Sequence, residues 1–192
     1  MGDRPAFDPA QASDDPIEEF QVWLSSATDQ LARAMVLSTV DEFGHPDARI
    51  VMLRGVSAAG WSFSSSALSP KGRQLADTPS AALTWWWPAS GRQVRARGAV
   101  VATDGAADFR TRPAESRAEV VVGRRQSAPL ADLDELRSAL AAADVTAVPA
   151  DWTSYEMRPT EVEFFELSAD RVHVRLRYDR AGDTWTRGLR WP

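Results

Sequence analysis

The feature that most constrains the fold of this chain is the order of its helical and strand-like hydrophobic patterns. A helical pattern over residues 17–34 is followed by alternating segments that predict strands at 35–40, 48–54, 61–66, 80–88 and 92–103. Helical patches follow near 104–111, 114–124 and 132–143, and further strand patterns close the chain at 160–167, 170–178 and 183–191. Strands, inserted helices and strands again predict a mainly β fold with helical insertions (α+β), an antiparallel β-barrel.

The 192 residues suffice for one domain of ordinary size. Residues 1–16 are rich in Asp, Pro and Ala and show no periodicity, which predicts a flexible N-terminal arm. We therefore expect a single domain over residues 17–192.

Composition excludes several classes of function. A net charge of −5 argues against general nucleic-acid binding, and two histidines with no cysteine make a metal site unexpected. There is no apolar run long enough to span a membrane and no signal-peptide pattern, so a soluble cytoplasmic protein is the default expectation. The chain also lacks the glycine-rich GxGxxG and Walker sequences, so a bound phosphate would depend on basic side chains.

Basic side chains gather in two places. In "RVHVRLRY", the alternation of a strand would put Arg171, His173 and Arg175 on one face. In "SPKGRQLADTP", Ser69 is placed to cap a helix whose first turn carries Lys71, where an anion would relieve the unfavourable helix dipole. An anionic ligand and an ordinary solvated polar surface both remain open as explanations.

Six segments agree in order and spacing with one known family. They are "AMVLSTVDEFGHPDARIVMLR" (34–54), "GWSFSSSALSPKGRQL" (60–75), "RQVRARG" (92–98), "RPAESR" (112–117), "RQSAPL" (125–130) and "EVEFFELSADRVHVRLRY" (161–178). On these segments, residues 34–192 resemble the pyridoxine/pyridoxamine 5′-phosphate oxidase family, which are FMN enzymes with a split-barrel fold.

The resemblance implies a homodimer with FMN in a cleft between two subunits, and neither nucleic acid nor membrane as partner. The implied FMN contacts are Arg49, Ile50, Val51, Ser64, Ser65, Lys71, Gln93, Gln126, Ser127, Phe165 and Arg175. Arg54, Arg112 and Ser116 would hold a substrate phosphate. Arg171 and His173 would lie over the substrate ring as catalytic residues.

The activity implied by the resemblance is hydride transfer from a substrate carbon to FMN, with dioxygen as the acceptor and hydrogen peroxide as product. A pyridoxamine or pyridoxine 5′-phosphate substrate would place the protein in pyridoxal 5′-phosphate biosynthesis. Two alternatives remain. One is a related oxidase of another ring metabolite in secondary metabolism, similar to enzymes of phenazine biosynthesis, and the other is a flavin-binding protein without turnover.

Departures from the family pattern leave the substrate open, and the sequence does not identify the electron acceptor. Asp108 stands where the family has a phosphate-binding Tyr, and Arg54 where it has Lys. Phe165 replaces a Trp, Val174 an Asp, and Pro70 an Arg. "WTSY" (152–155) and "LA" (31–32) replace a Trp-Gly-Gly stretch and an acidic-Pro pair. The FMN site is thus mostly kept, and the substrate site is partly rewritten.

Three consecutive tryptophans lie in the strand predicted over 80–88. Alternation sends Trp85 and Trp87 to one face and Trp86 to the other. Barrel core and dimer interface together explain this arrangement better than stacking on a flavin.

Overall fold

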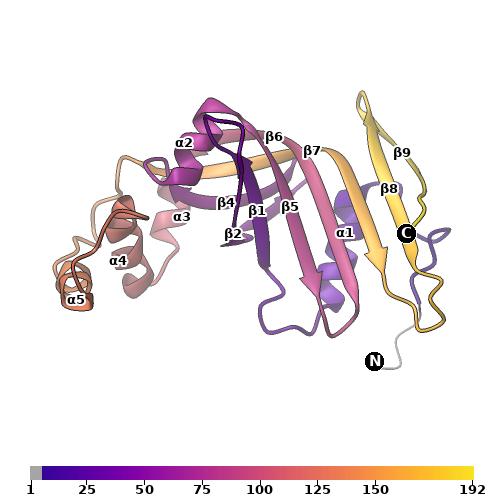
Figure 1. Cartoon of the computed structure of the whole chain (residues 1–192), viewed down its shortest axis with the longest axis horizontal. Coiled ribbons are helices and arrows are strands. Elements are labelled where there is room, and N and C mark those ends of the chain that lie inside the picture. Colours follow the sequence, from indigo (N-terminus) through magenta and orange to yellow (C-terminus); the bar gives the residue numbers. More distant parts are fainter. Residues whose placement is uncertain (1–5) are drawn as a thin grey trace.

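The computed structural model describes residues 6–192, and the strands in this part form one nine-stranded antiparallel sheet (Figure 1). The strands are β1 (Ala34–Val40), β2 (Pro46–Met52), β3 (Gly55–Ser57), β4 (Gly60–Ser66), β5 (Ser80–Trp87), β6 (Arg92–Asp104), β7 (Trp152–Glu166), β8 (Val174–Ala181) and β9 (Thr184–Leu189). The helices are α1 (Pro16–Ser26), α2 (Pro70–Asp77), α3 (Ala106–Arg110), α4 (Ala114–Val122), the 3-10 turn η1 (Gly123–Arg125) and α5 (Leu133–Ala141). The predicted order of strands, inserted helices and strands is confirmed.

The long strand β7 divides the sheet into two parts. Its first half pairs with β4, and its second half pairs with β8, while β6 runs beside it along most of its length. A register shift between Arg97 and Gly98 bends β6 near this division. A Cβ atom at Gly98 would lie 2.0 Å from the carbonyl oxygen of Arg158, so the two backbones can approach only with glycine there. The arrangement agrees with a split barrel.

The hydrophobic core lies between the sheet and α1. The Phe20 ring lies 4.6 Å from Trp85 and 5.2 Å from Trp61, and all three side chains are fully buried. Trp87 is buried beside them, whereas Trp86 on the other face is 47% exposed. The predicted alternation is therefore confirmed for the core, and a role for Trp86 in a dimer interface stays a prediction.

The first predicted helix is shorter than its periodicity indicated. The helix α1 ends at Ser26, and Ala27 is already extended (φ −74°, ψ 126°). The hydroxyls of Ser25 and Ser26 donate to the carbonyls of Val22 and Trp23, a local bonding pattern that competes with helix continuation. Leu31, expected on the apolar face of that helix, is 67% exposed.

The expected strand 170–178 was wrong at its start, because β8 begins at Val174. Asp170 Oδ1 accepts the N–H of Val172 at 2.9 Å, which forms a turn, and Arg171 has a positive φ of 69°. Arg171 and His173 therefore lie in the loop before β8 and do not share a strand face with Arg175.

Residues 1–5 of the expected flexible arm lie outside the described residues. Further along, Phe7 is buried, its ring lies 4.9 Å from that of Trp23, and its N–H donates to Glu166 Oε1 at 2.7 Å. The segment before α1 is thus anchored at Phe7, and both the flexibility of the arm and the single-domain boundary at residue 17 stay predictions.

No helix within residues 6–192 combines the length and the apolar character needed to cross a membrane.

Candidate functional site

A cavity of about 950 Å³ opens between the β2, β4 and α2 side of the molecule and the α4, η1 and α5 side. This volume lies within the range of sites for small organic ligands. Many of the residues expected from the family resemblance line it, namely Ile50, Val51, Arg54, Ser64, Ser65, Lys71, Arg112, Ser116, Gln126 and Ser127. One chain therefore brings together much of the expected FMN site and the expected substrate-phosphate site.

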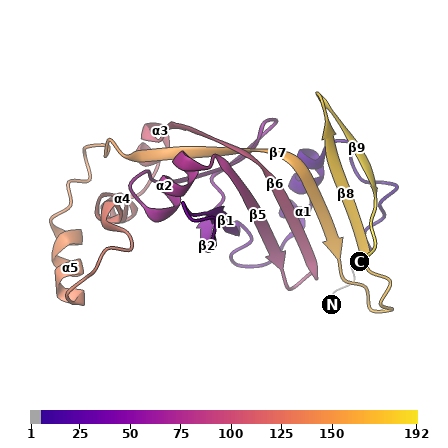
Figure 2. The same cartoon turned by 45° about the horizontal axis from the view of Figure 1, so that its top comes forward.

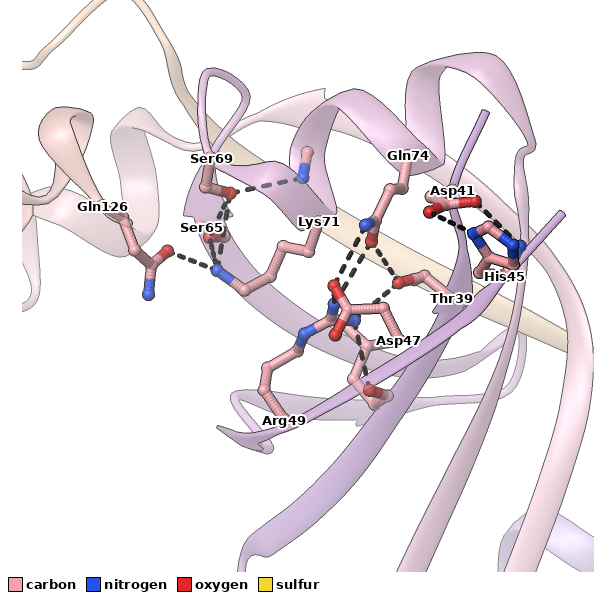
Figure 3. A network of polar contacts seen from close by, with 12 residues as sticks. Thr39, Asp41, His45, Asp47, Arg49, Ser65, Ser69, Lys71, Gln74 and Gln126 are labelled. Carbon is pink, nitrogen blue, oxygen red and sulfur yellow. Dashed lines mark hydrogen bonds and ion pairs between the residues drawn. The ribbon is translucent and has the colours of Figure 1, made fainter. Parts of the chain in front are cut away.

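Lys71 is one of the cations that line the cavity, and its ammonium lies close to Ser65, Ser69 and Gln126 (Figure 3). Ser69 caps α2 as predicted by accepting the N–H of Gly72 at 3.2 Å, and this places Lys71 in the first turn. The ammonium donates to Ser65 Oγ at 3.0 Å and to Gln126 Oε1 at 2.5 Å, although the residue is only 5% exposed. Burial, reinforced by the charge of Arg49, lowers the pKa of Lys71 to about 8.

These contacts fit the phosphate of a flavin nucleotide. Within the described residues, the hydrogen-bond partners of the Lys71 ammonium are neutral oxygens of Ser65, Ser69 and Gln126. A buried ammonium with neutral partners is stabilised by an anion, and hydroxyl and amide groups can complete the binding of phosphate oxygens.

Arg49 lies beside this site, where it joins a network of its own (Figure 3). It donates to Thr39 Oγ1 at 2.6 Å and to Gln74 Oε1 at 3.2 Å, and it forms an ion pair with Asp47. Ile50 and Val51 line the cavity, and Arg49 is not among its lining residues in the described chain. A contact between Arg49 and FMN stays a prediction.

Asp108 joins the two arginines expected to hold a substrate phosphate. Arg54 Nε donates to Asp108 Oδ1 at 2.7 Å, and Arg112 Nε donates to Oδ2 at 2.8 Å. Trp152 Nε1 also donates to Oδ2 at 3.0 Å, and its ring lies 4.9 Å below the Arg112 guanidinium. Burial acts to raise the pKa of Asp108, but the hydrogen bonds from Arg112 and Arg54 outweigh it, so the pKa lies below its usual value. The aspartate is therefore ionised at neutral pH.

A second group of expected residues lies on the other part of the sheet. Gln93, Phe165 and Arg175 face one another in register across β6, β7 and β8. The Arg175 guanidinium lies 5.2 Å from the centre of the Phe165 ring, and its Nη1 donates to Glu163 Oε1 at 2.8 Å. The ring of His173 lies edge-on to Phe165 at 5.7 Å, so the loop before β8 contributes to the same cluster.

The two groups are separated within one chain. The helices α4 and α5, which border the cavity, lie at one end of the long axis, and β8 lies at the other end in both views (Figures 1 and 2). Within one chain, the residues that the family resemblance implied thus form two separate groups.

Three residues of the candidate site were not predicted from the sequence. Trp152 is the first residue of β7, and its ring packs against Arg112, whereas in the sequence "WTSY" is only a departure from the family pattern. Glu163 holds Arg175, and Glu119 adds a carboxylate to the cavity. Glu163 lies in the segment 161–178 that carries the family resemblance, which could have indicated it beforehand, whereas no local signal separates Glu119 from the other acidic residues of the helices.

Known proteins agree with this arrangement. The family described as pyridoxamine 5′-phosphate oxidase matches residues 26–148, and the pyridoxine 5′-phosphate oxidase C-terminal dimerisation region matches residues 152–192. With the split sheet and the cationic cavity, these matches define the class, and the chain is an FMN-dependent oxidoreductase. It belongs to the pyridoxamine 5′-phosphate oxidase family.

Relatives span nearly the whole chain. Pyridoxine/pyridoxamine 5′-phosphate oxidase of Thermosynechococcus vestitus is 39% identical, with 95% of this chain and 92% of the relative covered. The enzyme of that name from Hyphomonas neptunium is also 39% identical, over 95% and 87%. The crystal structure of PhzG from Burkholderia lata 383, in complex with tetrahydrophenazine-1-carboxylic acid, has a TM-score of 0.90 at 27% identity and covers 100% of both chains.

Proposed function

We propose that this protein is an oxidase that binds FMN non-covalently in the cavity and uses dioxygen as electron acceptor. The observation that carries the proposal is the buried Lys71 ammonium, which has neutral partners in a cavity lined by the residues expected for FMN. When bound, FMN supplies the redox chemistry, in which the amine- or alcohol-bearing carbon of the substrate is oxidised and dioxygen is reduced to hydrogen peroxide.

The chain itself binds and orients the reactants. Lys71, Ser65 and Gln126 would hold the phosphate of the cofactor, and Ile50 and Val51 offer an apolar wall. The cluster around Phe165 would cover the reacting groups.

We propose that a two-fold homodimer completes each site. In support, the cavity and the Gln93, Phe165 and Arg175 row lie on different parts of one chain, and residues 152–192 match a region described as a dimerisation region. A two-fold axis would place the row of Gln93, Phe165 and Arg175 of one subunit beside the cavity of the other, and symmetry would make two equivalent sites.

In the cluster around Phe165, the His173 side chain has a ring nitrogen that can donate a hydrogen bond. Its Nδ1 accepts the N–H of Ser168 at 3.1 Å, so the neutral ring carries its proton on Nε2. This nitrogen, together with the Arg171 guanidinium, would orient the substrate over the flavin.

Two substrate classes follow from the relatives. Curated relatives are named for pyridoxine and pyridoxamine 5′-phosphate, which would place the protein in pyridoxal 5′-phosphate biosynthesis. The second candidate is a carboxylated ring metabolite, favoured by the similarity to PhzG in complex with tetrahydrophenazine-1-carboxylic acid and by Asp108 between the two arginines.

The purified protein tests this function directly. We expect a yellow protein whose visible spectrum is that of a flavin, with FMN released on denaturation and bound more tightly than riboflavin. Hydrogen peroxide should form with an amine or alcohol substrate, and pyridoxamine 5′-phosphate is the first to assay. Equal affinity for FMN and riboflavin would contradict the assignment of Lys71 to the phosphate.

A further inference from the structure

Two groups of cations line the cavity and are paired differently, and we call them the Lys71 end and the Arg54–Arg112 end. At one end, the hydrogen-bond partners of the Lys71 ammonium are neutral within the described residues. At the other end, Arg54 and Arg112 share the carboxylate of Asp108, with N–O distances of 2.7 and 2.8 Å. Arg125, which also lines the cavity, forms an ion pair with Glu135 at 2.6 Å.

Asp108 does not line the cavity itself in the described chain but contacts two arginines that do. Its side chain is only 11% exposed, and the two arginines are Arg54 and Arg112. It occupies the Nε–H of each arginine, and Arg112 Nη1 donates further to Ser116 Oγ at 3.3 Å. A ligand at this end would therefore meet the remaining terminal N–H groups of two guanidiniums, with an ionised carboxylate close behind them.

The three side chains together carry one net positive charge. That charge balances one carboxylate, whereas a phosphate monoester carries nearly two negative charges at neutral pH. Repulsion from Asp108 acts on each unit of ligand charge, so it disfavours a dianion about twice as strongly as a monoanion in the same place.

We propose that Asp108 shifts the selectivity of this end of the cavity away from a phosphate and towards a substrate that carries a single carboxylate. The proposal rests on the proposed function, in which FMN occupies the Lys71 end of the cavity. The anionic group of the substrate to be oxidised would then contact Arg54 and Arg112.

The opposite role for Asp108 is that of a positioning residue, which would hold the two arginines in the right orientation for a phosphate. The two roles predict opposite signs. Removing a selecting charge strengthens phosphate binding, whereas removing a positioning group weakens it.

Benzoate and phenyl phosphate form a matched pair of probes with one ring and different anionic groups. Their affinities are measured by calorimetry at pH 7.5 on the FMN-loaded protein, so that the Lys71 end is already filled. The decisive quantity is the ratio of the affinity for phenyl phosphate to that for benzoate, because the attraction of the two arginines and the repulsion from Asp108 both scale with ligand charge. In Asp108→Asn, the affinity for phenyl phosphate should rise about tenfold and that for benzoate about threefold, because the effect scales with ligand charge.

Asp14→Asn is the control for the change in net charge, since Asp14 is 97% exposed and pairs with Arg187 outside the cavity. It should leave both affinities unchanged. A second variant, Asp108→Ser, repeats the test without an amide that could bond to the arginines. A fall in phenyl phosphate affinity, or an equal change for both probes, overturns the proposal.

The visible absorbance of the same samples separates this inference from the proposed function. A protein that holds no FMN contradicts the proposed function. The charge dependence is then measured on the flavin-free protein with Lys71→Met in the background, which removes the other anion site. If Asp108→Asn changes the affinity for the two probes equally in that background, the proposed role of Asp108 is overturned independently of FMN binding.

Discussion

At the residue scale, Lys71 combines burial with a positive charge and a pKa of about 8. If Lys71 holds the FMN phosphate as proposed, this pKa would make the binding of FMN sensitive to pH. Below pH 8 the free protein carries an ammonium there, and above pH 8 it must take up a proton to bind the phosphate dianion with full strength. We therefore expect FMN affinity to be about tenfold lower at pH 9 than at pH 7, as read by fluorescence titration.

Riboflavin serves as the control because it has no phosphate for Lys71 to bind. Its affinity should change little over the same range, and Lys71→Met should flatten the FMN profile. An FMN profile as flat as that of riboflavin would remove Lys71 from the phosphate site.

The second residue-scale prediction concerns Arg175 and the loop that precedes β8, which carries Arg171 and His173. Arg175→Ala should weaken FMN retention, while Arg171→Ala and His173→Ala should leave FMN bound and lower turnover. Loss of one charged hydrogen bond costs about 1.5–3 kcal/mol, which corresponds to about a ten- to hundredfold effect. Flavin content and peroxide production are measured for each variant, and three variants with normal values in both would show that these residues form only a polar surface.

At the element scale, the position of Lys71 depends on the start of α2. Ser69 accepts the N–H of Gly72 at 3.2 Å and donates to the carbonyl of Ser66 at 2.7 Å, in a fully buried environment. Ser69→Ala should cost about 1 kcal/mol, lower the Tm by about 2–4 °C and reduce FMN affinity. Thermal unfolding with and without FMN measures both effects.

Ser25→Ala provides the matched control for this change. Ser25 lies near the exposed end of α1, where its hydroxyl donates only to the carbonyl of Val22. The substitution should alter neither the Tm nor FMN affinity appreciably. An equal loss in both variants would mean that the cap of α2 has no particular role.

At the scale of the whole molecule, the outer face of the sheet has exposed apolar residues that support the proposed dimer. Ile50, Met52 and Trp86 are exposed there, and Trp86 stands opposite Gln93 in the register that continues to Phe165. An exposed apolar patch of this kind is typical of a protein–protein interface. Trp86→Glu should therefore convert a dimer into a monomer that loses FMN, as measured by sedimentation and flavin content.

Val22→Glu is the control for this prediction, because Val22 is an exposed apolar residue on α1, whose other side packs into the core. That variant should remain dimeric and keep its flavin. If the unaltered protein is a monomer at micromolar concentration and still holds FMN, the dimer is not needed to complete the site.

The sequence by itself determined the features that depend on neighbouring residues. The period of two separated Trp85 and Trp87 from Trp86, and Ser69 marked the start of α2. The order of motifs identified the family before any contact was known. Alternation failed before β8, because the side chain of Asp170 bonds to the N–H of Val172 and turns the chain there.

Only the tertiary structure decided which distant residues meet. Asp108 was visible in the sequence as a departure, but its ion pair with Arg54 joins residues 54 positions apart. Likewise, Gln93, Phe165 and Arg175 form one row because of the registers of β6, β7 and β8. Periodicity fixes which face of a strand a side chain takes, whereas register and helix packing depend on the summed contacts of the whole core, which no local pattern contains.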